Sequence, residues 1–106
     1  MTYSDWSSFD GRADRALRSW PDTVAALPTG ATVSGRVIAR MPFGVFLDLD
    51  GHPDALGLVE ITGFPAGREL PAVGSAIEGV VVDHAAHNHQ VRLRPVTGDA
   101  GGPRYV

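Results

Sequence analysis

The first 29 residues carry apolar side chains at helical spacing. They recur every three or four positions, at Trp6, Phe9, Ala13, Leu17 and Trp20. This spacing predicts an amphipathic helix with one apolar stripe. Pro21 either ends that helix or begins a second short one over 21–27, because proline fits only the first turn of a helix. We therefore expect a helical extension over 1–29, ended by the Pro28-Thr29-Gly30 break.

Beyond the break, apolar and polar positions alternate with a period of two, which is typical of strands. The expected strands begin near Ala31 and continue as Gly44–Leu49, Gly57–Ile61, Ala76–Asp83 and Gln90–Arg94. We expect an irregular loop over 62–71, in which one helical turn could form, and a flexible tail over 96–106. Five short strands without helical crossovers predict an all-β fold, a five-stranded antiparallel barrel over 30–95.

The segment MPFGVFLDLDG, residues 41–51, departs from simple alternation. Val45, Leu47 and Leu49 share the side that faces the core, so Phe46 points outward beside aspartates. A bulge at Gly44 would turn Phe43 onto the same outer face. The two rings would then form a stacking platform for bases. The alternative is that the N-terminal helix or the loop over 62–71 covers both rings.

Composition narrows the range of functions. The chain has 106 residues, enough for one domain, with 43% hydrophobic and 20% charged residues. It lacks cysteine, which excludes disulfides and thiolate metal sites. Without an 18-residue apolar run or a signal-like leader, we expect a soluble cytoplasmic protein that does not associate with membranes. The net charge of −3 means that nucleic-acid binding must come from a local patch or from stacking.

Three histidines cluster in DHAAHNH, residues 83–89, where a solvated loop is a better interpretation than a metal site. A further alternative is that these histidines supply hydrogen bonds and stacking to a ligand. The sequence contains neither a nucleophile–base pair nor a phosphate-cradling glycine loop, so we expect no enzyme activity, no cofactor and no metal. Arg36 and Arg40 share strand parity, as do Arg92 and Arg94. These arginines either form a solvated face paired with acids or contact phosphates.

Several segments together resemble a known family. They are LPTGATVSGRVIARMPFGVFLDLDG, GLVEITGF, VGSAIEGVVVDH and VRLRP, from about residue 27 to 95. They are similar to the S-one-type RNA-binding domain, the repeat first described in the large ribosomal protein of that name. The resemblance implies a five-stranded oligonucleotide-binding (OB) barrel. It also implies that single-stranded RNA binds on a face built around the second and third strands.

The resemblance also implies site residues. Phe43 and Phe46 match the family's aromatic pair, whereas Glu60 stands where the family commonly has histidine. The family's aspartate falls near Ala85, and Asp83 could replace it from the same strand face. The family's arginine falls near His89 or the residue after it.

Weak, salt-sensitive binding of single-stranded RNA is the main functional hypothesis. The expected RNA-binding residues are Phe43, Phe46, Glu60, Asp83, Arg36, Arg40, His89 and Arg92. The alternative is a protein-interaction module that keeps the barrel but has lost RNA binding, as the acidic balance and Glu60 suggest. A protein partner could then dock on the N-terminal helix through Trp6, Phe9, Leu17 and Trp20.

Overall fold

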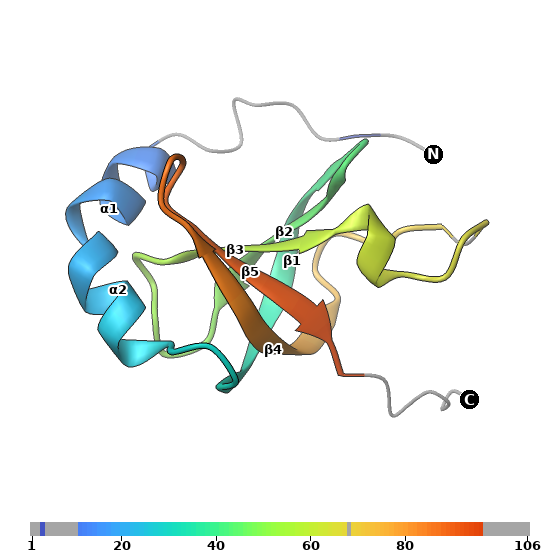
Figure 1. Ribbon diagram of the computed structural model, residues 1–106. Helices are drawn as coiled ribbons and strands as arrows, with labels where there is room; N and C mark the ends of the chain where they lie inside the picture. The colour runs from blue at the N-terminus through green and yellow to red at the C-terminus, as the bar shows by residue number, and fades with distance from the viewer. Residues whose placement is uncertain (1–2, 4–10, 68, 97–106) are drawn as a thin grey trace.

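The computed structural model describes residue 3, residues 11–67 and residues 69–96. Within these residues, two short helices precede five strands, and a 3-10 turn follows the third strand (Figure 1). The elements are α1 (Arg12–Arg18), α2 (Trp20–Ala26), β1 (Thr32–Met41), β2 (Gly44–Leu49), β3 (Leu56–Glu60), η2 (Ile61–Gly63), β4 (Ala76–Ala85) and β5 (Gln90–Pro95). The all-β class and the five strands expected from the alternation are confirmed.

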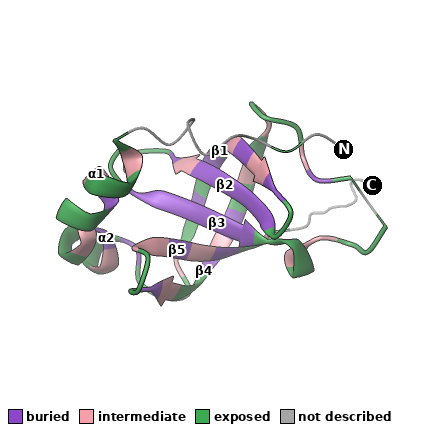
Figure 2. Ribbon diagram, turned by 90° about the horizontal axis from the view of Figure 1, so that it is seen from above, coloured by how far each residue is buried: buried purple, intermediate pink, exposed green. Residues whose placement is uncertain are grey.

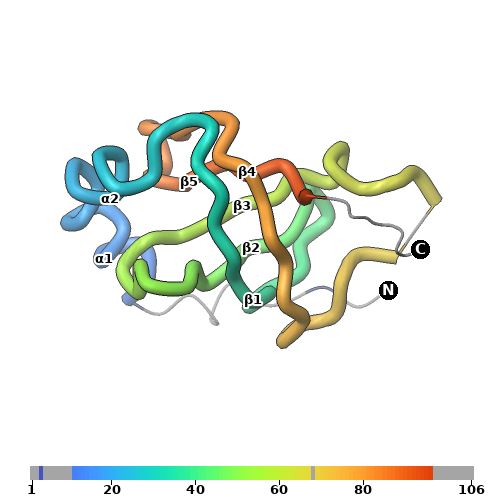
Figure 3. The backbone as a smooth tube through the Cα atoms, turned by 90° about the horizontal axis from the view of Figure 1, so that it is seen from below, coloured from blue at the N-terminus to red at the C-terminus, as the bar shows by residue number. Residues whose placement is uncertain are grey.

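The five strands close into a barrel in the order β1-β2-β3-β5-β4 (Figure 3). Four of the neighbouring pairs are antiparallel, but β3 and β5 run parallel. The expectation of a purely antiparallel barrel is therefore wrong. An odd number of strands cannot alternate in direction around a closed ring, so at least one pair must be parallel. The long connection from β3 to β4 supplies the necessary crossover.

The barrel interior is filled by the inward-facing side chains of all five strands. Val45, Leu47 and Leu49 of β2 are buried there, as their alternation predicted. Leu27, which follows α2, and Leu70, in the β3–β4 connection, join the same core. Figure 1 shows α1 and α2 at one end of the barrel and η2 with its following loop at the other. The connections thus contribute apolar side chains to the core that the short strands enclose.

Two strands carry bulges that their sequences did not reveal. The pairing register shifts between Val37 and Ala39 in β1, and between Val81 and Asp83 in β4. Each bulge inserts one residue and reverses the parity of the residues after it. Arg36 and Arg40 therefore lie on opposite faces of β1, contrary to the sequence expectation.

The predicted bulge at Gly44 is also wrong. Pro42 and Phe43 form a two-residue turn, and Met41 pairs with Gly44 across the β1–β2 hairpin. Phe43 therefore lies in the turn, where strand parity does not determine its direction. The hairpin rather than a bulge brings the two phenylalanines together.

The residues of the helical extension that pack on the barrel differ from those of the predicted apolar stripe. In α1, Ala16 is buried, whereas Ala13 is exposed and Leu17 is 53% exposed. Trp20, at the start of α2, packs against the barrel core. Trp6 and Phe9, the other predicted members of the stripe, lie outside the described residues. Neither described helix is long and apolar enough to cross a membrane.

Candidate nucleic-acid interface

Apolar side chains form a second cluster on the outside of the barrel. We call this cluster the outer floor; it consists of Ala39, Met41, Phe46, Leu56 and Leu58. Paired residues on neighbouring strands point to the same face, and Phe46 pairs with both Ala39 and Leu58. Ala16 of α1 packs against this cluster. Figure 2 shows the buried colouring along β2 and β3.

Phe46 is buried rather than exposed. Its exposed fraction is 1%, although it lies on the outer face as predicted. Ala16 of α1 belongs to the same buried cluster, so the N-terminal helical extension packs on this face. The ring forms part of a packed apolar layer, so its first contribution is to stability.

An open depression adjoins the outer floor. Its volume is about 350 Å³, and it is lined by Phe43, Phe46, Leu58, Glu60, Ala85, His87, Asn88, Gln90 and Arg92. Phe43 lies at the rim of the depression and is 42% exposed. Its ring meets that of Phe46 edge to face, with ring centroids 5.7 Å apart and ring planes at 83°. One aromatic ring is thus buried while its neighbour stands at the rim. Such edge-to-face contacts are favoured by the charge distribution of aromatic rings.

The position of Phe43 is fixed by its backbone. The amide of Ile61 donates a hydrogen bond to the carbonyl oxygen of Phe43 at 2.7 Å, which ties the turn to the end of β3. Gly44 has a φ of 150°, and a Cβ at this position would overlap the carbonyl oxygen of Val59. Glycine is therefore required where β2 and β3 approach, and this close approach places Phe43 beside Glu60.

Arg92 joins two carboxylates at the rim. Its Nη2 lies 3.2 Å from Asp83 Oδ2, and its Nη1 lies 3.5 Å from Glu60 Oε2. The bulge at Val82 makes this arrangement possible, because it places Asp83 opposite Arg92. With one cation and two anions, the group carries a net charge of −1. Arg92 Nε is buried and has no hydrogen-bond partner among the described residues.

The other predicted basic residues are held elsewhere. Arg36 donates to the carbonyl oxygen of Gly74 at 3.0 Å, and Arg40 pairs with Glu69 at 3.2 Å. Both partners belong to the β3–β4 connection, and neither arginine lines the open depression. The bulge in β1 explains why Arg40 turns away. Of the eight predicted site residues, the structure gathers Phe43, Phe46, Glu60, Asp83 and Arg92.

His89 and His84 face the helical extension. Their rings pack edge to face against Trp20, at centroid distances of 5.5 Å and 6.2 Å respectively. His84 Nε2 also lies 2.7 Å from the carbonyl oxygen of Leu27. His89 thus contacts α2 instead of the depression, while His87 lines the depression. Within residue 3, residues 11–67 and residues 69–96, no three histidine, aspartate or glutamate side chains are placed to hold a metal ion.

Five residues that line the depression are absent from the predicted site residues: Leu58, Ala85, His87, Asn88 and Gln90. Leu58 and Asn88 show why. Leu58 sits on β3 between the buried Gly57 and Val59, and a continuous apolar run gives no sign of which residue faces outward. Asn88 belongs to the β4–β5 tip, in which only the histidines were considered as ligand contacts. The pairing of Leu58 with Arg92 across the parallel strands brings this tip to the outer face. A sequence prediction that paired β3 and β5 in parallel would have placed both residues on the outer face.

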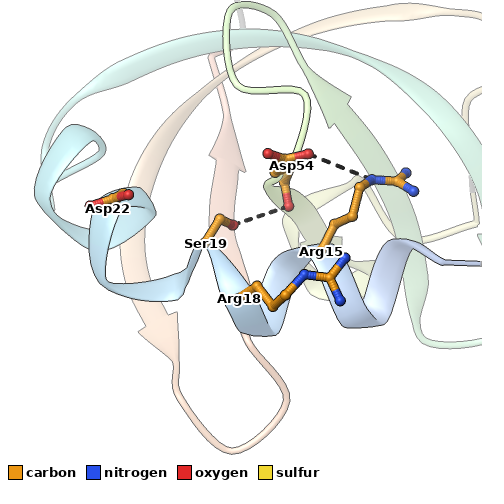
Figure 4. A pocket seen from close by; sticks show the side chains of 5 residues that line it. All are labelled: Arg15, Arg18, Ser19, Asp22 and Asp54. Carbon is orange, nitrogen blue, oxygen red and sulfur yellow. Dashed lines mark hydrogen bonds and ion pairs between the residues drawn. The ribbon is translucent and has the colours of Figure 1, made fainter.

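A second depression lies where the helices meet the β2–β3 turn (Figure 4). It is lined by Arg15, Arg18, Ser19, Asp22 and Asp54. Ser19 Oγ donates to the carbonyl oxygen of Asp54 at 3.3 Å, and Arg15 Nε lies 3.6 Å from Asp54 Oδ1. These contacts anchor the helical extension to the barrel. The balanced charges of this depression give it no preference for an anion.

Comparison with known proteins identifies the fold. No protein-family model matches the chain, and no curated protein matches its sequence. Among solved structures, RNase R from Mycoplasma genitalium superposes with a TM-score of 0.65 at 18% identity, over 80% of this chain and 15% of RNase R. GSP13 from Bacillus subtilis gives a TM-score of 0.55 at 21% identity, over 74% of this chain and 67% of GSP13. The barrel has the OB fold.

A third structure agrees with this assignment. The uncharacterized protein MJ1198 from Methanocaldococcus jannaschii superposes with a TM-score of 0.55 at 20% identity, over 66% of this chain and 93% of MJ1198. These likenesses match the S-one-type OB barrel that the sequence resemblance implied. At such low identity they establish the fold alone.

Proposed function

We propose that this protein binds single-stranded RNA, weakly, through the open depression beside Phe43. The observation that carries the proposal is the gathering of Phe43, Glu60 and Arg92 from three separate segments around one hollow of an OB barrel, where Arg92 also pairs with Asp83 of β4. RNase R from Mycoplasma genitalium, which shares the fold, has also been solved in complex with ribose methylated single-stranded RNA. That complex supports the proposal by analogy.

In this proposal Phe43 supplies the stacking surface. Its ring is 42% exposed, whereas that of Phe46 is 1% exposed, and a base stacked on it is worth about 1–3 kcal/mol. Phe46 and Leu58 support the stack from below because they form its packed apolar base. Base stacking does not depend on net charge, so it can operate in an acidic protein.

Electrostatics limits the affinity. Arg92 is the only cation of the described residues that line the depression, and two carboxylates already compensate its charge. When a protein binds a single strand, a plot of log affinity against log salt concentration has a slope of about −0.7 for each phosphate contacted. With one arginine in contact, the slope should therefore lie near −0.7. Binding should weaken with salt, but far less than for a basic nucleic-acid-binding protein.

Titration of the ¹⁵N-labelled protein with a short single-stranded RNA at low salt tests the proposal. We expect amide shifts at Phe43, Glu60 and Arg92, with smaller shifts at Val73 in the β3–β4 connection. An unchanged spectrum at millimolar RNA would refute RNA binding. Shifts confined to Arg36 and Arg40 would place the RNA on a different surface.

A protein-interaction module is the second candidate. It is favoured by the negative rim charge and by Leu17, which is 53% exposed on α1 beside the exposed Ala13. A complex that survives nuclease and is lost in Leu17→Ser, but not in Phe43→Ala, would favour this candidate. Loss of an RNA-dependent complex in Phe43→Ala alone would favour the first.

A further inference from the structure

From the hydrogen-bonding groups of the open depression we infer a base preference: Glu60 selects a guanine stacked on Phe43. This inference rests on the proposed RNA binding and adds the identity of the base. Glu60, at the end of β3, pairs with Gly44 of β2, the residue that follows Phe43 in the sequence. The hydrogen bond from the amide of Ile61 to the carbonyl oxygen of Phe43 holds the β1–β2 turn against the same end of β3.

The carboxylate of Glu60 is the less neutralised of the two at the rim. Arg92 lies 3.2 Å from Asp83 but 3.5 Å from Glu60, and Glu60 rather than Asp83 lines the depression. The Glu60 side chain is about half exposed, so its oxygens can accept further hydrogen bonds. Asp83 then anchors Arg92, and Glu60 presents an acceptor to the ligand.

A carboxylate at this position repels phosphate, so a bound strand must turn a base toward it. The preferred base is the one whose edge offers donors. Guanine offers two parallel donors, N1–H and the 2-amino group, which match the two oxygens of a carboxylate. Adenine and cytosine offer one amino group each on this edge. Uracil offers a single N–H between two carbonyl oxygens, which a carboxylate repels.

The neighbouring side chains do not oppose this preference. Asn88 and Gln90 carry amides that can donate or accept, so they can adapt to any base. The Arg92 guanidinium, the cationic donor, faces the two carboxylates. The depression therefore offers a charged acceptor next to an aromatic ring, which is the combination that distinguishes guanine from uracil.

Competition among single-stranded heptamers tests the inference. The set is UUUGUUU, UUUAUUU, UUUCUUU, UUUUUUU and UUUIUUU, in which inosine lacks the 2-amino group. We expect UUUGUUU to bind at least about fivefold more tightly than UUUUUUU, with the inosine heptamer in between, because a bidentate contact is worth about this factor or more. Glu60→Gln should abolish the preference, so that this variant binds UUUGUUU and UUUUUUU equally. Glu78→Gln, the same change at an exposed glutamate of β4 outside the depression, should keep it.

The outcomes separate this inference from the proposal on which it depends. Equal binding of all five heptamers would overturn the guanine preference and leave RNA binding intact. A preference that persists in Glu60→Gln would overturn the role of Glu60. Failure of every heptamer to bind would overturn both the inference and the proposed function.

Discussion

The outer floor and the open depression occupy one face of the barrel but differ in what they can do. The floor is built from β1, β2 and β3, and its five apolar side chains are buried with Ala16 of α1 against them. The depression adds the β4–β5 tip and carries charged and amide groups around a half-exposed phenylalanine. Two adjacent phenylalanines consequently have separate tasks. Phe46 supports the fold, and Phe43, which is 42% exposed, is the ring on which we propose that a base stacks.

Replacing Phe46 with alanine should give the largest effect on stability. A fully buried phenylalanine leaves a cavity, so the free energy of unfolding should fall by about 3–5 kcal/mol. Denaturant titration measures this, and Phe43→Ala, at the exposed rim, serves as the matched control with a loss of about 1 kcal/mol or less. Equal losses for the two variants would remove the distinction between floor and depression.

Gly44→Ala should come next. The new Cβ would overlap the Val59 carbonyl oxygen at a φ of 150°, so the unfolding free energy should fall by about 2–4 kcal/mol. Gly51→Ala is the control, because φ there is 80° but nothing lies within 4 Å, and its cost should be near 1 kcal/mol. If Gly44→Ala were no worse than Gly51→Ala, the close approach of β2 and β3 would not position Phe43.

Arg92→Gln should affect binding more than folding. The two ion pairs of Arg92 are partly exposed, so their loss should cost only about 0–1 kcal/mol of stability. Without the cation, the slope of log affinity against log salt concentration should become shallower by about 0.7, so that it lies near zero. Arg94→Gln, on the same strand but outside the depression, should leave the slope unchanged. A slope equally altered in both variants would assign phosphate contact to the whole strand.

The ion pair that holds α1 near the floor should give the smallest effect. Arg12 Nη1 lies 3.5 Å from Asp48 Oδ1, and both side chains are partly exposed. A double-mutant cycle with Arg12→Ala and Asp48→Ala should give a coupling of about 0.2–0.5 kcal/mol. A coupling above about 2 kcal/mol would show that charge rather than Ala16 packing holds α1 in place.

Sequence patterns predicted the barrel interior well and its outer face poorly. Alternation placed Val45 and Leu47 inside, because a buried face tolerates only apolar side chains. The bulges at Ile38 and Val82 were missed, since each lies within an apolar run that fits either register. The missed bulge in β1 is the reason that Arg36 and Arg40 were wrongly placed together.

The outer face depends on contacts between distant segments. Phe46 is buried in a cluster that includes Ala16, a small residue whose sequence context gave no sign of that packing. Glu60 meets Arg92 because β3 and β5 run parallel, which the expectation of an antiparallel barrel did not include. Asp83 meets Arg92 because the bulge in β4 places it opposite Arg92 on β5. Their residue types came from the family resemblance, whereas their arrangement required the fold.

The affinity of Phe43→Ala for a short single-stranded RNA tests the central claim most directly. Fluorescence anisotropy at low salt should show binding at least about fivefold weaker than that of the unchanged protein, because one stacked base is lost. Val73→Ala, which truncates an exposed apolar residue in the β3–β4 connection, should bind as the unchanged protein does. Unaltered affinity in a folded Phe43→Ala variant would contradict the claim that the open depression is the RNA-binding surface.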